Sequence, residues 1–293
     1  MNKNDIYTLE DRGILYLQGE NILEFLQNLI TNDVNKVKEN YSCFASLLTP
    51  QGKYLFDFII IKHKNGYFLD CEKKQIDQLY KQLNIYKLRS KVEILNLSNE
   101  FVVAAISRGK FLSLQNAKDV PGFTMKYNED SIILDPRNKE LGARLIINLE
   151  KLDHSIKKLE LNSKESSEYY MYSHRLGIAQ LDTDKLQNKI FGIECNFEEL
   201  NGIDFKKGCY VGQENTARIK LKQKLNKRLF AIKVLEGKIN SDEITYESKV
   251  VGKLLINNQN PFALIKFKDE NFNFENNFKC GDAKIKVIRP KWL

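Results

Sequence analysis

Apolar positions along the first third of the chain alternate between strand-like and helix-like spacing. Residues 14–17 form a short apolar run that predicts a strand. Apolar side chains then recur at intervals of three and four through residues 22–30, the spacing of an amphipathic helix, with Asn21 as its expected N-cap. Residues 55–61 predict a second strand, and the preceding Pro50-Gln51-Gly52 turn predicts a hairpin.

The C-terminal part has a different pattern. Short apolar runs separated by polar turns occupy residues 229–235, 249–256, 262–267 and 283–288. This spacing favours a small β-barrel or sandwich. We therefore predict an α+β fold with two domains, residues 1–222 and 223–293. Within the first we expect two interleaved lobes, roughly 1–50 with 150–222, and 51–149.

Composition adds limits on the class of protein. The chain has 293 residues, of which 42% are hydrophobic and 29% charged, as in ordinary globular proteins. No apolar run is long enough for a membrane helix, and no secretory signal is visible at the N-terminus. The five cysteines are scattered without a Cys-x-x-Cys pair or zinc-ligand spacing. These observations predict a cytoplasmic protein with free thiols, no stable metal and no membrane partner.

The net charge of +8 raises the question of nucleic acid. Lysines are spread along the whole chain, so the charge alone does not define a binding face. Residues 218–228 carry the densest basic run, which we interpret as a solvated linker into the C-terminal domain. Contact with a phosphate backbone or an acidic partner is the alternative.

The most unusual stretch is residues 206–214, which combines two lysines, two glycines and a cysteine. Cys209 lies between Gly208 and Gly212 and follows a basic pair. If a helix begins near Gly212, its N-terminus and the cations favour thiolate over thiol at Cys209. Glu214 and Arg218 would share a face of that helix. A reactive or ligand-capable cysteine is therefore the functional interpretation, and a small buried core residue is the structural one.

A second anomaly is Asp57, a carboxylate inside the apolar run of residues 55–61. A carboxylate in this position has to be paired, hydrogen-bonded or directed at a cavity. The alternative is that it lies on the exposed face of an edge strand.

Residues 207–214, Lys-Gly-Cys-Tyr-Val-Gly-Gln-Glu, resemble the K-G-C-Y-x-G-Q-E signature of the YgfZ family. Members of this family are folate-binding relatives of the glycine-cleavage T-protein, and they include mitochondrial factors that mature iron–sulfur proteins. The resemblance implies that Cys209 is the catalytic or ligand residue. It marks as the remaining motif residues Lys207, Gly208, Tyr210, Gly212, Gln213, Glu214 and Arg218.

The same resemblance extends to a folate site and to the fold. It implies folate contacts by Asp57, Glu194, Asn32 and Asn196, although the last three are also explained as turn or loop polars. The T-protein has an Asp-Asp pair where this chain has Phe56-Asp57, so one carboxylate is missing. The implied fold is the T-protein's three-lobed arrangement around a folate-sized channel. The arginines of Asp135-Pro136-Arg137 and Leu141-Gly142-Ala143-Arg144 are interpreted as structural.

The function implied by the resemblance is that of a folate-binding factor for assembly or repair of iron–sulfur proteins, indirectly supporting tRNA modification. Tetrahydrofolate or a derivative would be the cofactor, and iron–sulfur client or assembly proteins the partners. The alternatives are a folate-dependent aminomethyltransferase of the glycine-cleavage type and an RNA-binding adaptor that uses residues 218–228. Whether any turnover occurs stays open at this point.

Overall fold

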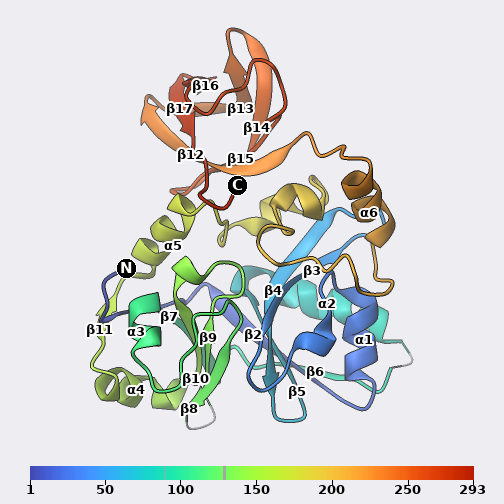
Figure 1. Cartoon of the computed structure of the whole chain (residues 1–293), viewed down its shortest axis with the longest axis vertical. Helices are drawn as coiled ribbons and strands as arrows, with labels where there is room; N and C mark the ends of the chain where they lie inside the picture. Colours follow the sequence, from blue (N-terminus) through green and yellow to red (C-terminus); the bar gives the residue numbers. More distant parts are fainter. Residues whose placement is uncertain (89, 128–129) are drawn as a thin grey trace.

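The computed structural model describes residues 1–88, 90–127 and 130–293, and its strands form three groups (Figure 1). The helices are α1 (Ile22–Leu29), α2 (Ile76–Lys87), α3 (Arg108–Leu112), α4 (Leu152–Lys158), α5 (Ser166–Arg175) and α6 (Gln213–Leu221). No helix of the described residues is long and apolar enough to cross a membrane.

The first sheet has the strand order β3-β4-β5-β2-β6 and is antiparallel throughout. Its strands are β2 (Arg12–Gln18), β3 (Cys43–Leu48), β4 (Tyr54–His63), β5 (Gly66–Glu72) and β6 (Glu93–Asn96). Helices α1 and α2 cover one face, where Phe25, Leu26 and Leu79 pack against strand residues such as Phe58. The predicted helix at 22–30, the strand at 55–61 and the hairpin are thus confirmed.

Asn21 is the N-cap residue of α1, as predicted, but its side chain makes no capping hydrogen bond. Its amide oxygen instead accepts a hydrogen bond from the backbone N–H of Lys91, 70 residues away. A long-range partner has therefore replaced the local one that the sequence suggested.

The second sheet has the order β11-β1-β7-β10-β9-β8, in which only the β1–β11 pair is parallel. Its strands are β1 (Asp5–Thr8), β7 (Phe101–Ile106), β8 (Thr124–Tyr127), β9 (Asp130–Leu134), β10 (Ala143–Asn148) and β11 (Asn162–Lys164). The predicted lobe boundary at residue 50 falls inside the hairpin of β3 and β4, which belong to one sheet. The sheets therefore divide the strands differently from the predicted lobes.

A buried network of charged side chains joins the two sheets. Asp70 on β5 accepts from Arg12 Nε at 2.7 Å and from Arg144 Nη1 on β10 at 2.5 Å. Arg144 also pairs with Asp135, which accepts two hydrogen bonds from the guanidinium of Arg137. Burial alone would raise the pKa of Asp135, but the two arginines lower it below its usual range. Arg137 and Arg144 both pair with Asp135 inside the protein, which fits the structural interpretation of these arginines.

The C-terminal part is a closed barrel in the order β12-β15-β14-β13-β16-β17. Its strands are β12 (Arg228–Glu236), β13 (Ile239–Tyr246), β14 (Lys249–Ile256), β15 (Phe262–Ile265), β16 (Phe278–Gly281) and β17 (Ala283–Val287). The barrel prediction is confirmed, although β13 and β16 were not expected. Against α5, His174 Nε2 lies 3.0 Å from the carbonyl oxygen of Pro261, and Trp292 Nε1 donates to the carbonyl of Leu176 at 2.8 Å.

Candidate functional site

The loop before α6 is held in place by its own lysine. Lys207 is buried, and its ammonium donates to the carbonyls of Gln27, Ile30 and Asn32 at 2.7, 2.7 and 3.0 Å. These carbonyls lie at the C-terminal end of α1, where helical acceptors have no partner within the helix. Burial lowers the pKa of Lys207 to about 8, so at neutral pH the ammonium keeps its three donors. Lys207 therefore clamps the loop to α1: its three hydrogen bonds hold the loop against the end of that helix.

A hairpin turn holds the other end of the same loop. Gly212 has φ +83°, and a Cβ there would lie 2.5 Å from the carbonyl oxygen of Thr49. Gly52 approaches it from the β3–β4 turn and also has a positive φ. Asn215 Nδ2 on α6 donates to the carbonyl of Gln51 at 2.9 Å. Only glycine meets both the backbone conformation and the close approach at residue 212.

Cys209 lies at the tip of the loop between these two anchors. It is the exposed cysteine of the five, while Cys43, Cys71, Cys195 and Cys280 are buried. Helix α6 begins at Gln213 with Gly212 as its N-cap residue, so the predicted helix start is confirmed. The alternative interpretation, that Cys209 is a small buried core residue, does not hold, because this cysteine is exposed.

Gly208 differs from Gly212 in having no structural reason to be glycine. A Cβ added at Gly208 meets nothing within 4 Å, and its φ is not among the positive ones. The backbone beside Cys209 is therefore open, and a larger ligand or partner can approach it closely.

The remaining signature residues divide into buried and exposed ones. Tyr210 is buried, its ring lies 5.1 Å from the Lys207 ammonium, and burial raises its pKa to about 12. Glu214 is exposed on α6, and Arg218 donates to Asn215 Oδ1 at 2.6 Å. Gln213 is half-buried at the helix start. Glu214 and Arg218 lie on one face of α6, as expected from their spacing, without an ion pair between them in the described chain.

We expect Lys207→Met to lower the free energy of unfolding by about 2 kcal/mol, because it leaves buried carbonyls without donors. Urea denaturation measures this change. The neighbouring Lys206→Met is the matched control, since Lys206 is exposed and should alter stability little. Equal stability of the two variants would contradict the clamp.

Asp57 lies on β4 at a small cavity between the first sheet, residues 177–200 and the start of β12. Its Oδ2 accepts a hydrogen bond from Tyr54 at 2.9 Å. Burial raises the pKa of Asp57 above its usual range, against the opposing effect of Arg12 and Arg137. Of the alternatives that the sequence left for this carboxylate, the structure shows a hydrogen bond and a place at a cavity. Arg137, Phe44 and Phe197 line the same cavity, and sequence analysis had not placed them there.

The other three expected folate contacts use their polar groups within the protein. Asn32 donates to the carbonyls of Phe44 and Asn201, both at 2.7 Å. Asn196 lines the cavity but donates to the Leu229 carbonyl and accepts from Arg228. Glu194 accepts from the Phe191 backbone N–H at 2.8 Å and is not among the cavity-lining residues. The structure thus brings Asp57 and Asn196 together, and leaves Glu194 and Asn32 outside.

A folate-type cofactor fits this cavity in chemistry but not in volume. A carboxylate acceptor between aromatic rings suits the aminopyrimidine edge of a pterin. The cavity, however, measures about 20 Å³, room for about one water molecule. The cavity at Asp57 is therefore too small for a pterin in this structure, although Asp57 itself is partly exposed. Phe44 and Phe197 both line the cavity and pack edge-to-face against each other, with ring centroids 5.3 Å apart.

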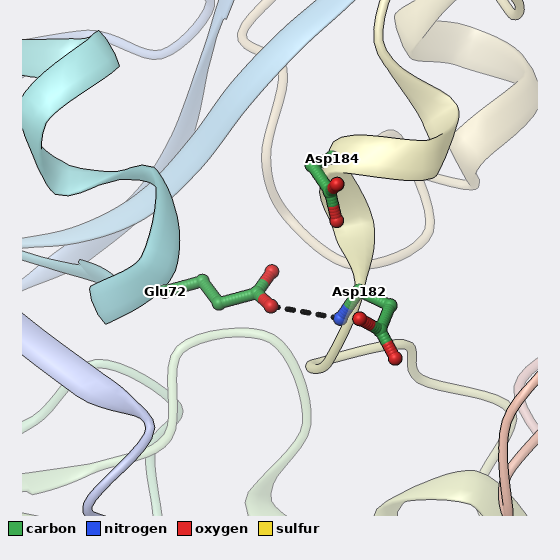
Figure 2. A group of neighbouring side chains, drawn as sticks. All are labelled: Glu72, Asp182 and Asp184. Atoms are coloured by element: carbon green, nitrogen blue, oxygen red, sulfur yellow. Dashed lines mark hydrogen bonds between the residues drawn. The ribbon is translucent and has the colours of Figure 1, made fainter.

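One acidic cluster of the described residues has the spacing of a metal site. The ligand atoms of Glu72, Asp182 and Asp184 lie within 4.8 Å of one another. Figure 2 shows Glu72 directed at the backbone N–H of Asp182, to which the distance is 2.8 Å. The ammonium of Lys74 pairs with Asp182 at 2.5 Å and with Asp184 at 2.7 Å. Lys74 and backbone donors therefore offset part of this charge, and these contacts connect residues 182–184 to the end of β5.

The fold and sequence comparisons agree on the class of protein. The structure matches the glycine cleavage system aminomethyltransferase T of Bartonella henselae with a TM-score of 0.77, over 99% of this chain and 86% of that one, at 11% identity. The chain thus has the T-protein fold. No family model matches the chain.

In sequence, the chain is similar to iron–sulfur cluster assembly factors of the IBA57 type. It is 28% identical over 275 residues to the Dictyostelium discoideum IBA57 homolog, covering 84% of this chain and 66% of that protein. It is 27% identical to mouse IBA57 over 256 residues, which cover 82% of this chain and 68% of that protein. The chain spans between about half and two thirds of the length of the first relatives it matches. The chain is therefore similar in sequence to IBA57 proteins and shares the fold of the T-protein.

The same relatives correct the predicted location. Each is named as a mitochondrial protein, which points to mitochondria and not to the cytoplasm. Scattered free cysteines are compatible with either compartment, so they could not distinguish the two.

Proposed function

We propose that this protein is a folate-binding factor in the assembly or repair of iron–sulfur cluster proteins, and that it acts through Cys209. The observation that carries the proposal is the exposure of this thiol at the tip of a loop that Lys207 and Gly212 hold from both sides. The similarity to proteins named iron–sulfur cluster assembly factors supports it.

A single thiol cannot hold a cluster alone, since clusters usually take four protein ligands. Any iron or cluster at Cys209 would therefore be shared with a client or assembly partner, for which the open backbone at Gly208 leaves room. Support of tRNA modification, through an iron–sulfur enzyme among the clients, rests on the YgfZ resemblance alone. The proposal is tested by expressing the protein in cells that lack their own relative. Restored activity of iron–sulfur enzymes is the expected result, and unchanged enzyme deficiency would contradict it.

The folate part of the proposal rests on Asp57 and the T-protein fold. We expect tetrahydrofolate to raise the thermal midpoint of the protein, because a ligand that binds the native state stabilises it. Asp57→Asn should weaken binding by roughly 10- to 100-fold, since it replaces a charged acceptor with a neutral amide. Isothermal titration measures the affinity directly.

Glu194→Gln is the matched control for Asp57→Asn, because it changes a carboxylate that does not line the cavity. Its affinity for tetrahydrofolate should stay close to that of the unmodified chain. If Glu194→Gln weakens binding as much as Asp57→Asn, the pocket extends beyond the small cavity at Asp57. A thermal midpoint that stays constant up to millimolar tetrahydrofolate would remove the folate claim.

Aminomethyl transfer is the second candidate, favoured by the T-protein fold. The fold alone does not decide between the two, because one fold hosts several activities. The single carboxylate at Phe56-Asp57 argues against it. The RNA-binding alternative is weakened because two cations of the basic run at 218–228 form ion pairs within the protein. Lys220 pairs with Glu198, and Arg228 pairs with Glu199.

A further inference from the structure

Strand β12 of the barrel has a free edge near α5. Its first half, Arg228–Ala231, pairs with β15, and its second half, Ile232–Glu236, pairs with β17 on the other side. Within the described chain, no strand continues the β15 ladder beside residues 233–236. These four residues are exposed, although they belong to a strand.

The direction of the free backbone groups follows from one hydrogen bond. The N–H of Ile232 donates to the carbonyl of Pro261 at 2.9 Å, which lies on the β15 side. Backbone groups in a strand alternate in direction with a period of two residues. The N–H and C=O of Val234 therefore face the same side, beyond the end of β15. An unpaired strand edge of this kind is a template for another extended segment.

A groove of about 1120 Å³ runs along this edge. Its walls are α5 and residues 257–261, and β12 and the turn at 237–239 complete it. Figure 1 shows α5 directly below the barrel, on the opposite side of the molecule from α6. Apolar surface is supplied by Met171 and Val234, which are 44% and 40% exposed. The wall at residues 257–260 consists of asparagine and glutamine side chains, whose amides match the hydrogen-bonding groups of a peptide backbone.

The charge of the groove selects among possible occupants. Arg175, Lys233 and Lys238 line it, against Glu168 as the acidic residue. None of the three cations forms an ion pair with the described residues. Lysines on an edge oppose pairing with uncharged or basic strands, whereas an acidic segment neutralises them.

We propose that this groove binds an extended acidic segment of a partner protein, which pairs with β12 as an added strand. Backbone hydrogen bonds to Val234 supply the pairing, and alternate side chains of the segment reach Met171 or the cations. This docking surface is separate from the loop of Cys209 and does not depend on folate or on cluster chemistry.

The test uses two fluorescein-labelled seven-residue peptides, one of alternating glutamate and valine and the other of alternating lysine and valine. Fluorescence anisotropy with the full chain should show binding of the glutamate peptide and at least tenfold weaker binding of the lysine peptide. Val234→Pro removes the free N–H without touching the β17 ladder, and should weaken binding about tenfold or more. Val234→Ala keeps the N–H and should retain most of the affinity.

The double variant Lys233→Glu with Lys238→Glu should reverse the preference between the two peptides. Equal thermal midpoints of the variants and the unmodified chain establish that the fold is intact. The proposal is overturned by no binding of the glutamate peptide, by equal binding of the two peptides, or by unchanged affinity of Val234→Pro. It is also overturned if sedimentation shows a dimer that Val234→Pro dissociates, because a second copy of the chain then occupies the edge.

Discussion

Cys209→Ser should abolish restoration of iron–sulfur enzyme activity while leaving the thermal midpoint unchanged. The thiol is exposed at the tip of its loop, so a one-atom change removes no packing. The anchors of the loop, Lys207 and Gly212, do not involve the sulfur atom. Complementation of cells that lack their own relative measures the loss, and differential scanning calorimetry measures the stability.

Alkylation provides the chemical control for this prediction. Iodoacetamide should modify one thiol in the native protein, and the Cys209→Ser variant should take up none. Burial protects the other thiols and raises the pKa of Cys43 and of Cys71 to about 12, which disfavours the reactive thiolate.

Two outcomes would contradict the assignment of Cys209. Full complementation by Cys209→Ser would make the thiol dispensable, and the site would then act through Gln213, Glu214 and Arg218. Unfolding of the variant would show that the sulfur atom is part of the core.

Asp70→Asn should lower the free energy of unfolding by about 3–5 kcal/mol, the usual cost of removing one partner from a buried ion pair. Asp70 is fully buried and accepts from two guanidinium groups, those of Arg12 and Arg144. The substitution leaves two buried cations around a neutral amide. Since Arg144 belongs to the second sheet, we expect the junction between the sheets to weaken first.

Asp119→Asn is the matched control for Asp70→Asn. Asp119 also pairs with two cations, Arg108 and Lys139, but at the surface, where solvent screens the interaction. Urea denaturation of both variants gives the comparison. A loss of stability no larger for Asp70→Asn than for Asp119→Asn would show that the buried network contributes little.

Local elements of this fold follow directly from the sequence. The spacing of apolar residues in 22–30 is sufficient to predict α1, and the apolar run at 55–61 predicts β4. Gly212 before a helix start is a local signal as well, since a positive φ is needed at that residue. In each case the physical cause lies within a few residues of the element it determines.

Strands β13 and β16 could not be found in the same way. In β13, Ile244 is the fully buried residue and most of the others are exposed or half-buried, so the period of two is absent. β16 has four residues, Phe-Lys-Cys-Gly, and therefore lacks the apolar run that marked the other strands. These strands exist because their neighbours in the barrel supply the hydrogen bonds.

For the candidate site, too, some features follow from the sequence and others only from the tertiary structure. The sequence by itself marked Cys209 as the reactive residue and Asp57 as an anomalous carboxylate, because neither residue suits its local pattern. Only the tertiary structure decided that Lys207 clamps α1 and that Glu194 and Asn32 bind backbone groups. The acceptors of Lys207 lie more than 170 residues away in the chain, so no local pattern could identify them. The small volume of the cavity at Asp57 has the same cause, since packing between distant segments determines it.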